Sequence, residues 1–196
     1  MLIYRSMGSA LIAISQHWWA VILVVIANFA SFGILFSLED RFESLSGVPT
    51  FDTQNDLTAQ RLLEQLALYS GEARTAYFQF AAFDFLFPLI AGLFVAVLWT
   101  LLLRLNRWKP VMRLYQARLF LLPLLTTLAD WLENISLLSI LNTPTAPNEA
   151  WVQAALIFKA LKLLLLNVSL AGIVILAALL IYDRWLRARW TVQQAR

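Results

Sequence analysis

The sequence contains no cysteine and only one histidine, His17. The absence of cysteine excludes disulfide bonds, thiolate metal sites and cysteine nucleophiles. One histidine cannot by itself build the multi-histidine sites that zinc and related metals use. We therefore predict no metal site built on these side chains.

Charged residues are also scarce. Only 14% of the 196 residues are charged and 61% are hydrophobic, which lies outside the range of ordinary soluble domains. The formal net charge is +3, but the basic residues are localised rather than spread over a surface. This composition predicts a membrane protein with membrane lipids as its surroundings, and nucleic acid is not expected as a partner.

Common nucleotide and metal motifs are missing from the chain. It has no G-x-x-x-x-G-K-[ST] phosphate loop, no G-x-G-x-x-G fingerprint and no H-E-x-x-H pair. Each of these motifs works by a geometry that requires its spacing. We therefore expect no cofactor.

Four apolar stretches are long enough to cross roughly 30 Å of hydrocarbon at about 1.5 Å per residue. They cover approximately residues 18–37, 77–103, 119–141 and 152–181. The sequence thus predicts an all-α integral membrane protein with one domain, residues 1–196. The expected fold is an antiparallel bundle of four transmembrane helices.

The charges of the connecting segments predict the orientation of this bundle. Residues 104–118 contain five basic residues and no acidic one, and the tail, residues 182–196, is basic as well. Positive segments near membrane spans remain in the cytoplasm. Both termini are therefore expected to be cytoplasmic, with the plasma (inner) membrane as the expected location, and the acidic loop 38–76 is expected outside.

The external loop contains one amphipathic pattern, in residues 56–69. Asp56 stands where a helix N-cap is expected, and Gly71 lies just beyond the predicted end. Leu62, Leu63, Leu66 and Tyr69 form an apolar stripe on this helix. We predict an extracytoplasmic helix that packs on the bundle or lies on the membrane.

The second span contains Asp84 and Pro88. Proline has no N–H, so the carbonyl group of Asp84, four residues earlier, loses its helical partner. In a membrane such a carbonyl group must be satisfied by another part of the protein or by internal water. The pattern predicts either a simple packing kink or a polar site in which the carboxyl group takes part.

The third span contains the most polar stretch within any helix. Asp130, Glu133 and Asn134 are spaced i, i+3 and i+4, so a helix places them on one face. Charged groups at membrane depth are costly unless they are paired or hydrated, and they usually mark a functional site. We predict that this face points into the bundle.

Basic residues of the fourth span match this depth. Lys159 and Lys162 lie at i and i+3 and share a face. Counted from the outer ends of the spans, all six groups lie roughly 10 to 17 Å deep at about 1.5 Å per residue. The predicted site combines Asp84, Asp130, Glu133, Asn134, Lys159 and Lys162.

The first hypothesis for this site is binding of an amphiphilic small molecule that resembles a lipid or isoprenoid. Asp130 and Glu133 would form an acid/base pair, because two neighbouring carboxyl groups separate in pKa. Asp84, Asn134, Lys159 and Lys162 would bind the polar end. Whether the protein is an enzyme stays open at this point, and the sequence identifies no protein partner.

Three alternatives compete with this hypothesis. The buried charges can form a salt-bridge network that fixes helix register in a structural or accessory subunit. They can also form a proton or cation pathway, although the inner halves of the spans offer few polar groups. A hard cation bound by Asp84, Asp130 and Glu133 is less attractive, because two lysines lie nearby.

Overall fold

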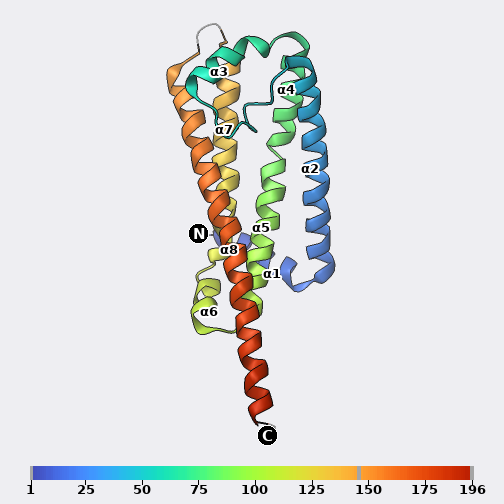
Figure 1. Cartoon of the computed structure of the whole chain (residues 1–196), viewed down its shortest axis with the longest axis vertical. Helices are drawn as coiled ribbons and strands as arrows, with labels where there is room; N and C mark the ends of the chain where they lie inside the picture. Colours follow the sequence, from blue (N-terminus) through green and yellow to red (C-terminus); the bar gives the residue numbers. More distant parts are fainter. Residues whose placement is uncertain (1, 145–146, 195–196) are drawn as a thin grey trace.

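The computed structural model describes residues 2–144 and 147–194, with side chains described for residues 6–144 and 147–185. Every regular element in these ranges is a helix (Figure 1). The elements are α1 (Leu2–Gln16), α2 (Trp18–Ser46), α3 (Ala59–Gln65), η1 (Leu66–Leu68), α4 (Gly71–Asp84), α5 (Phe87–Leu105), α6 (Lys109–Gln116), η2 (Leu119–Leu121), α7 (Leu124–Asn142) and α8 (Glu149–Gln194).

Four helical segments are long and apolar enough to cross a membrane: Trp18–Ser46, Gly71–Leu105, Leu119–Asn142 and Glu149–Trp185. Only 17% of the most apolar window of the first segment and 11% of that of the fourth are buried within the protein. The exposed remainder includes large side chains such as Phe29 and Val174. A soluble protein rarely exposes apolar surface on this scale, so the chain is a membrane protein.

Helix α5 lies at the centre of the packing and contacts α1, α2, α7 and α8. The connection that carries α3 lies at one end of the molecule and the connection that carries α6 at the other (Figure 1). We call these the α3 end and the α6 end. Each end has its own apolar core, one around Phe42, Phe80 and Ile140 and the other around Trp99 and Phe120.

Close packing of α8 on α5 depends on Gly172. A Cβ atom at this position would overlap the ring of Trp99. The ring nitrogen Nε1 of Trp99 in turn donates a hydrogen bond of 2.9 Å to the carbonyl group of Ser169. This contact joins α5 and α8 just beside the site described below.

At the α3 end, residues 47–58 fold back toward the interior instead of remaining on the surface (Figure 1). Phe51 is fully buried, and its ring stacks on that of Tyr69 with a centroid distance of 4.1 Å. The Tyr69 hydroxyl accepts the Phe51 backbone N–H at 2.9 Å. This hydrogen bond satisfies the backbone N–H of Phe51, which would otherwise be buried without a partner. We call residues 47–58 the inward loop.

The helix predicted over residues 56–69 is present but shorter, because Thr58 and not Asp56 is its N-cap. Thr58 has an extended backbone, and its hydroxyl accepts the Arg61 N–H at 3.2 Å. Asp56 instead forms an exposed ion pair with the Arg61 side chain at 2.6 Å. Gly71 lies beyond the end of this helix as expected, because η1 ends at Leu68, and it is also the first residue of α4.

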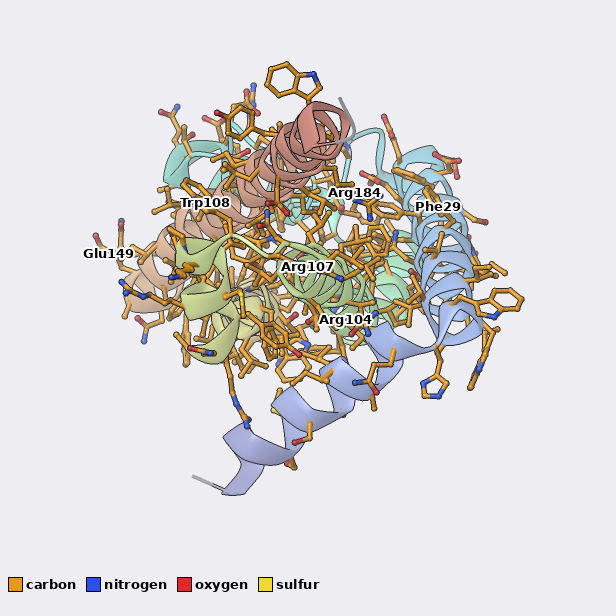
Figure 2. The ribbon with its side chains drawn as sticks, turned by 90° about the horizontal axis from the view of Figure 1, so that it is seen from below. Phe29, Arg104, Arg107, Trp108, Glu149 and Arg184 are labelled. Carbon is orange, nitrogen blue, oxygen red and sulfur yellow. The ribbon has the colours of Figure 1, made fainter. Side chains whose placement is uncertain are left out.

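Helix α1 crosses the α6 end, as Figure 2 shows from below. Its Ser15 carbonyl accepts a hydrogen bond of 2.6 Å from the Arg104 guanidinium. Arg104 lies in the last turn of α5, and the labelled Arg107 lies beside it in the same view (Figure 2). The basic segment, residues 104–118, therefore lies at the α6 end, where α1 covers part of it.

Candidate functional site

The helix break predicted at Pro88 lies between α4 and α5. Side chains of α7 donate hydrogen bonds to the carbonyl groups around this break. The Asn134 side-chain amide donates to the Asp84 carbonyl at 3.2 Å. Trp131 Nε1 donates to the Phe85 carbonyl at 2.8 Å, and the Thr127 hydroxyl donates to the Pro88 carbonyl at 2.7 Å. One face of α7 thus satisfies the carbonyl groups of the broken segment, as membrane burial requires.

This face of α7 approaches α5 closely because residue 92 is glycine. A Cβ atom at Gly92 would overlap the Thr127 hydroxyl oxygen. Thr127 is itself buried, with 3% of its surface exposed. The short distance between α5 and α7 therefore depends on the missing side chain at position 92 as well as on the hydrogen bonds.

Glu133 is the centre of the charged cluster. Its side chain has no exposed surface, and its carboxylate forms ion pairs with Lys159 Nζ at 2.7 Å and with Lys162 Nζ at 2.5 Å. Lys162 also pairs with Asp130 at 2.9 Å. Buried charges that lack a partner are expensive, so the two lysines and two carboxylates must be held together.

Asn134 extends this cluster to Asp84. Its amide nitrogen lies 2.9 Å from Asp84 Oδ2 and 3.4 Å from Asp130 Oδ2. Within the described side chains, Asp84 forms no ion pair with a basic residue. All six residues predicted from the sequence therefore meet in one network, with Asp84 held by an amide and not by a lysine.

Asp52 is a member of this network that sequence analysis missed. Its backbone carbonyl accepts Lys159 Nζ at 3.0 Å, and its carboxylate accepts the Tyr77 hydroxyl at 2.9 Å. Asp52 Oδ1 is buried and has no hydrogen-bond partner among the described residues. The residue lies in the inward loop, where helical rise gives no estimate of depth, so the sequence held no signal for its position.

The surroundings of Asp52 disfavour its charged form. Burial raises the pKa of the Asp52 carboxyl from 3.8 to about 6, and the negative charges of Glu133 and Asp130 act in the same direction, while Lys162 and Lys159 oppose them. Between pH 3.8 and about pH 6, the Asp52 carboxyl is protonated when the loop is docked and ionised when the loop is undocked and solvated. Linkage then makes docking most stable below about pH 4 and weaker as the pH rises through 6.

We therefore expect the inward loop to open more readily at pH 7 than at pH 4.5. The full pKa difference corresponds to roughly 3 kcal/mol of docking free energy, and about 2 kcal/mol of this change falls between pH 4.5 and pH 7. Hydrogen exchange of the Phe51 amide, corrected for its intrinsic rate, measures this change. Asp52→Asn should remove most of the pH dependence, and Asp56→Asn, an exposed carboxylate nearby, should retain it. Equal pH dependence in wild type and Asp52→Asn would contradict the assignment.

A cavity of about 250 Å³ adjoins the charged network. We call it the α2–α8 cavity, because it lies between these two helices and over α5. Its lining residues are Phe32 of α2, Phe87, Pro88, Ala91, Gly92 and Val95 of α5, Pro123, Thr126 and Asp130 at and within α7, and Lys162, Leu166 and Ser169 of α8. The walls are thus mostly apolar, and the polar groups are few.

Two hydroxyl groups in this cavity have no protein partner. Thr126 Oγ1 and Ser169 Oγ are both buried, and neither forms a hydrogen bond with the described residues. Ser169 has only 1% of its surface exposed. An unpaired buried polar group costs about 1–3 kcal/mol, so both hydroxyls are available to a molecule that enters the cavity.

Comparisons with known proteins leave the site to be interpreted from its own chemistry. No protein-family model, curated protein or solved structure matches the chain. Among the described residues, no group of three or more His, Cys, Asp and Glu side chains is arranged to hold a metal ion. The feature that remains is a polar network beside an apolar cavity, an arrangement typical of small-molecule sites.

Proposed function

We propose that this protein is a four-pass membrane protein that binds a lipid-like or isoprenoid-like amphiphile in the α2–α8 cavity. The observation that carries this proposal is that Asp130 and Lys162 line a cavity with apolar walls and two unpaired buried hydroxyls. A head group gains hydrogen bonds there, and its chain contacts Phe32, Phe87 and Leu166. Apolar walls with a few convergent polar groups favour such ligands.

The size and position of the cavity support entry from the lipid. Its volume of about 250 Å³ is slightly below the roughly 300 to 1,000 Å³ of pockets that hold whole drug-sized ligands. Helix α2 packs mainly on α4 and then on α5, whereas α8 packs mainly on α7 and then on α5, so in the described part of the chain α2 and α8 are not packed closely on each other. We infer that the cavity holds the head group and the start of the chain, while the rest extends between α2 and α8 into lipid.

The orientation in this proposal follows from charge. The four spans form an antiparallel bundle with the basic α6 end and both termini in the cytoplasm, in the plasma membrane. The α3 end and its acidic loop are then extracytoplasmic. The charged network lies near this end, because its Lys159 contacts the inward loop, and the cavity adjoins the network at Asp130 and Lys162.

Binding is supported more directly than turnover. Of the two carboxylates that the sequence suggests as an acid/base pair, only Asp130 lines the cavity, and Glu133 is held by both lysines. If the ligand is converted, Asp130 is the group placed to exchange a proton with it. Glu133 would then act by holding Lys162 beside Asp130.

Two competing functions are less well supported. A network that only fixes helix register explains the ion pairs of Glu133, but it does not explain the adjoining cavity with unpaired hydroxyls. Conduction of protons or cations needs a polar route to the α6 end, where Val97, Trp99, Leu103 and Phe120 form a buried apolar core. This layer favours binding over transport.

The experiment that tests the proposal is mass spectrometry of the lipids that co-purify with the protein. We expect a bound amphiphile in wild type, and at least a tenfold loss in Asp130→Asn and in Ala91→Trp, which fills the cavity without a change in charge. Ala171→Trp adds the same side chain to an exposed position on α8 and should retain the ligand. An Ala91→Trp variant that is folded and carries the same lipids as wild type would refute the proposal.

A further inference from the structure

Both charged groups that line the α2–α8 cavity keep some hydrogen-bonding capacity. The Lys162 ammonium has three N–H donors and pairs with two carboxylates, Asp130 at 2.9 Å and Glu133 at 2.5 Å, so one donor remains. Asp130 Oδ1 accepts Lys162, but Oδ2 has only the long 3.4 Å contact with Asn134. A contact of that length is near the limit of a hydrogen bond, so Asp130 retains an acceptor for a donor in the cavity.

The charge of the surrounding network is also unequal. Four carboxyl groups, those of Asp52, Asp84, Asp130 and Glu133, surround only two ammonium groups, those of Lys159 and Lys162. Both lysines are engaged with carboxylates, so the network holds no unpaired positive charge. In an environment of low dielectric constant, a negative head group would add to this excess of carboxyl groups, and only the remaining N–H donor of Lys162 would offset its repulsion by Asp130.

The two unpaired hydroxyls complete the pattern. Thr126 Oγ1 and Ser169 Oγ can each donate and accept a hydrogen bond, and neither carries a charge. They can bind a neutral, positively charged or negatively charged polar group, so they supply hydrogen bonds without selecting for charge. The selectivity of the cavity for charge therefore rests on Asp130 and on the excess of carboxyl groups behind it.

We infer that the ligand head group carries an O–H or N–H donor and no negative charge, as in a long-chain alcohol or amine. The head group donates to Asp130 Oδ2 and shares hydrogen bonds with the hydroxyls of Thr126 and Ser169. Long-chain carboxylates and phosphates are excluded from the site. This inference rests on the proposed binding function and specifies the class of amphiphile.

The test uses three probes with the same chain: dodecan-1-ol, dodecylamine and dodecanoate. The purified full-length protein is exposed to an equimolar mixture in detergent micelles, and native mass spectrometry measures the retained probes. Retention by Ala91→Trp, in which the cavity is filled, is subtracted as the contribution of the micelle and the protein surface. We expect the alcohol and the amine to be retained at least tenfold more than the carboxylate.

Two further variants separate charge from hydrogen bonding. Asp130→Asn removes the negative charge and leaves Lys162 paired with Glu133, so retention of dodecanoate should rise at least fivefold while that of dodecylamine falls. Thr126→Val combined with Ser169→Ala removes both hydroxyls without a change in charge, so retention of dodecan-1-ol should fall at least fivefold. The helical circular dichroism signal confirms that each variant is folded.

The outcomes distinguish this inference from the proposed function. Retention of dodecanoate equal to or greater than that of the alcohol and amine would overturn the inference about the head group and leave amphiphile binding intact. Retention of all three probes at the level of Ala91→Trp would overturn both. An Asp130→Asn variant with the selectivity of wild type would also overturn the inference, because it would show that the carboxylate does not select the head group.

Discussion

Replacement of Glu133 by glutamine is expected to destabilise the protein by about 3–5 kcal/mol, the usual cost of removing one partner of a buried ion pair. Glu133 has no exposed surface and accepts both Lys159 and Lys162. Glutamine has nearly the same volume, so the effect comes from lost charge and not from a cavity. Lys159 would lose its carboxylate partner and keep only neutral acceptors, the Asp52 carbonyl among them. The unfolding midpoint in SDS or on heating measures the change.

A matched control and a rescue variant separate this explanation from a general sensitivity of the fold. Asp56→Asn removes the partner of an exposed ion pair with Arg61 and should leave the midpoint unchanged. Lys159→Met added to Glu133→Gln removes the stranded ammonium group and should restore much of the stability, because apolar replacements of buried ion pairs are often tolerated. A Glu133→Gln midpoint equal to that of wild type would contradict the central role of Glu133.

The second large effect is expected at Asn134. Asn134→Leu removes the only donor of the α7 face that reaches both the Asp84 carbonyl and the Asp84 carboxylate. Each buried acceptor left without a partner costs about 1–3 kcal/mol, so we expect a total of roughly 3 kcal/mol. Hydrogen exchange near residues 84–88 should also accelerate, because the helix break loses its support from α7.

Ser139→Ala provides the control for this prediction on the same helix. Ser139 is half-buried, and among the described residues its hydroxyl donates to the Ile135 carbonyl of its own helix, at 2.7 Å. This variant should unfold at the midpoint of wild type and show unchanged exchange at the break. If Asn134→Leu behaved in the same way, the freed carbonyl of Asp84 would have to be satisfied by another group.

The sequence predicted the polar network well because membrane depth limits where charged groups can lie. Asp130, Glu133 and Asn134 had to share a face by helical geometry, and Lys159 and Lys162 lay at the same counted depth. Pro88 predicted the loss of the partner of the Asp84 carbonyl, and Asn134 is the group that replaces it. These predictions used only periodicity, rise per residue and the cost of unpaired polar groups.

The sequence predicted the structure of the connecting segments less accurately. Asp56 and Thr58 are both good N-cap residues, and local sequence does not decide between them, whereas the structure uses Thr58. The inward loop posed a larger difficulty, because its position depends on Phe51 stacking on Tyr69 and on Lys159 meeting the Asp52 carbonyl. Those partners are distant in the chain, so no local pattern indicates them.

By itself, the sequence determined that this is a helical membrane protein with four apolar segments and a buried set of opposite charges. Hydrophobicity and helical periodicity are local properties, so the order of residues alone reveals them. Only the tertiary structure decided that Glu133 takes both lysines, that Asp52 joins the network, and that a cavity exposes Asp130 beside the unpaired hydroxyls of Thr126 and Ser169. Pairing and cavity shape depend on the distances between helices, which close contacts such as those at Gly92 and Gly172 determine.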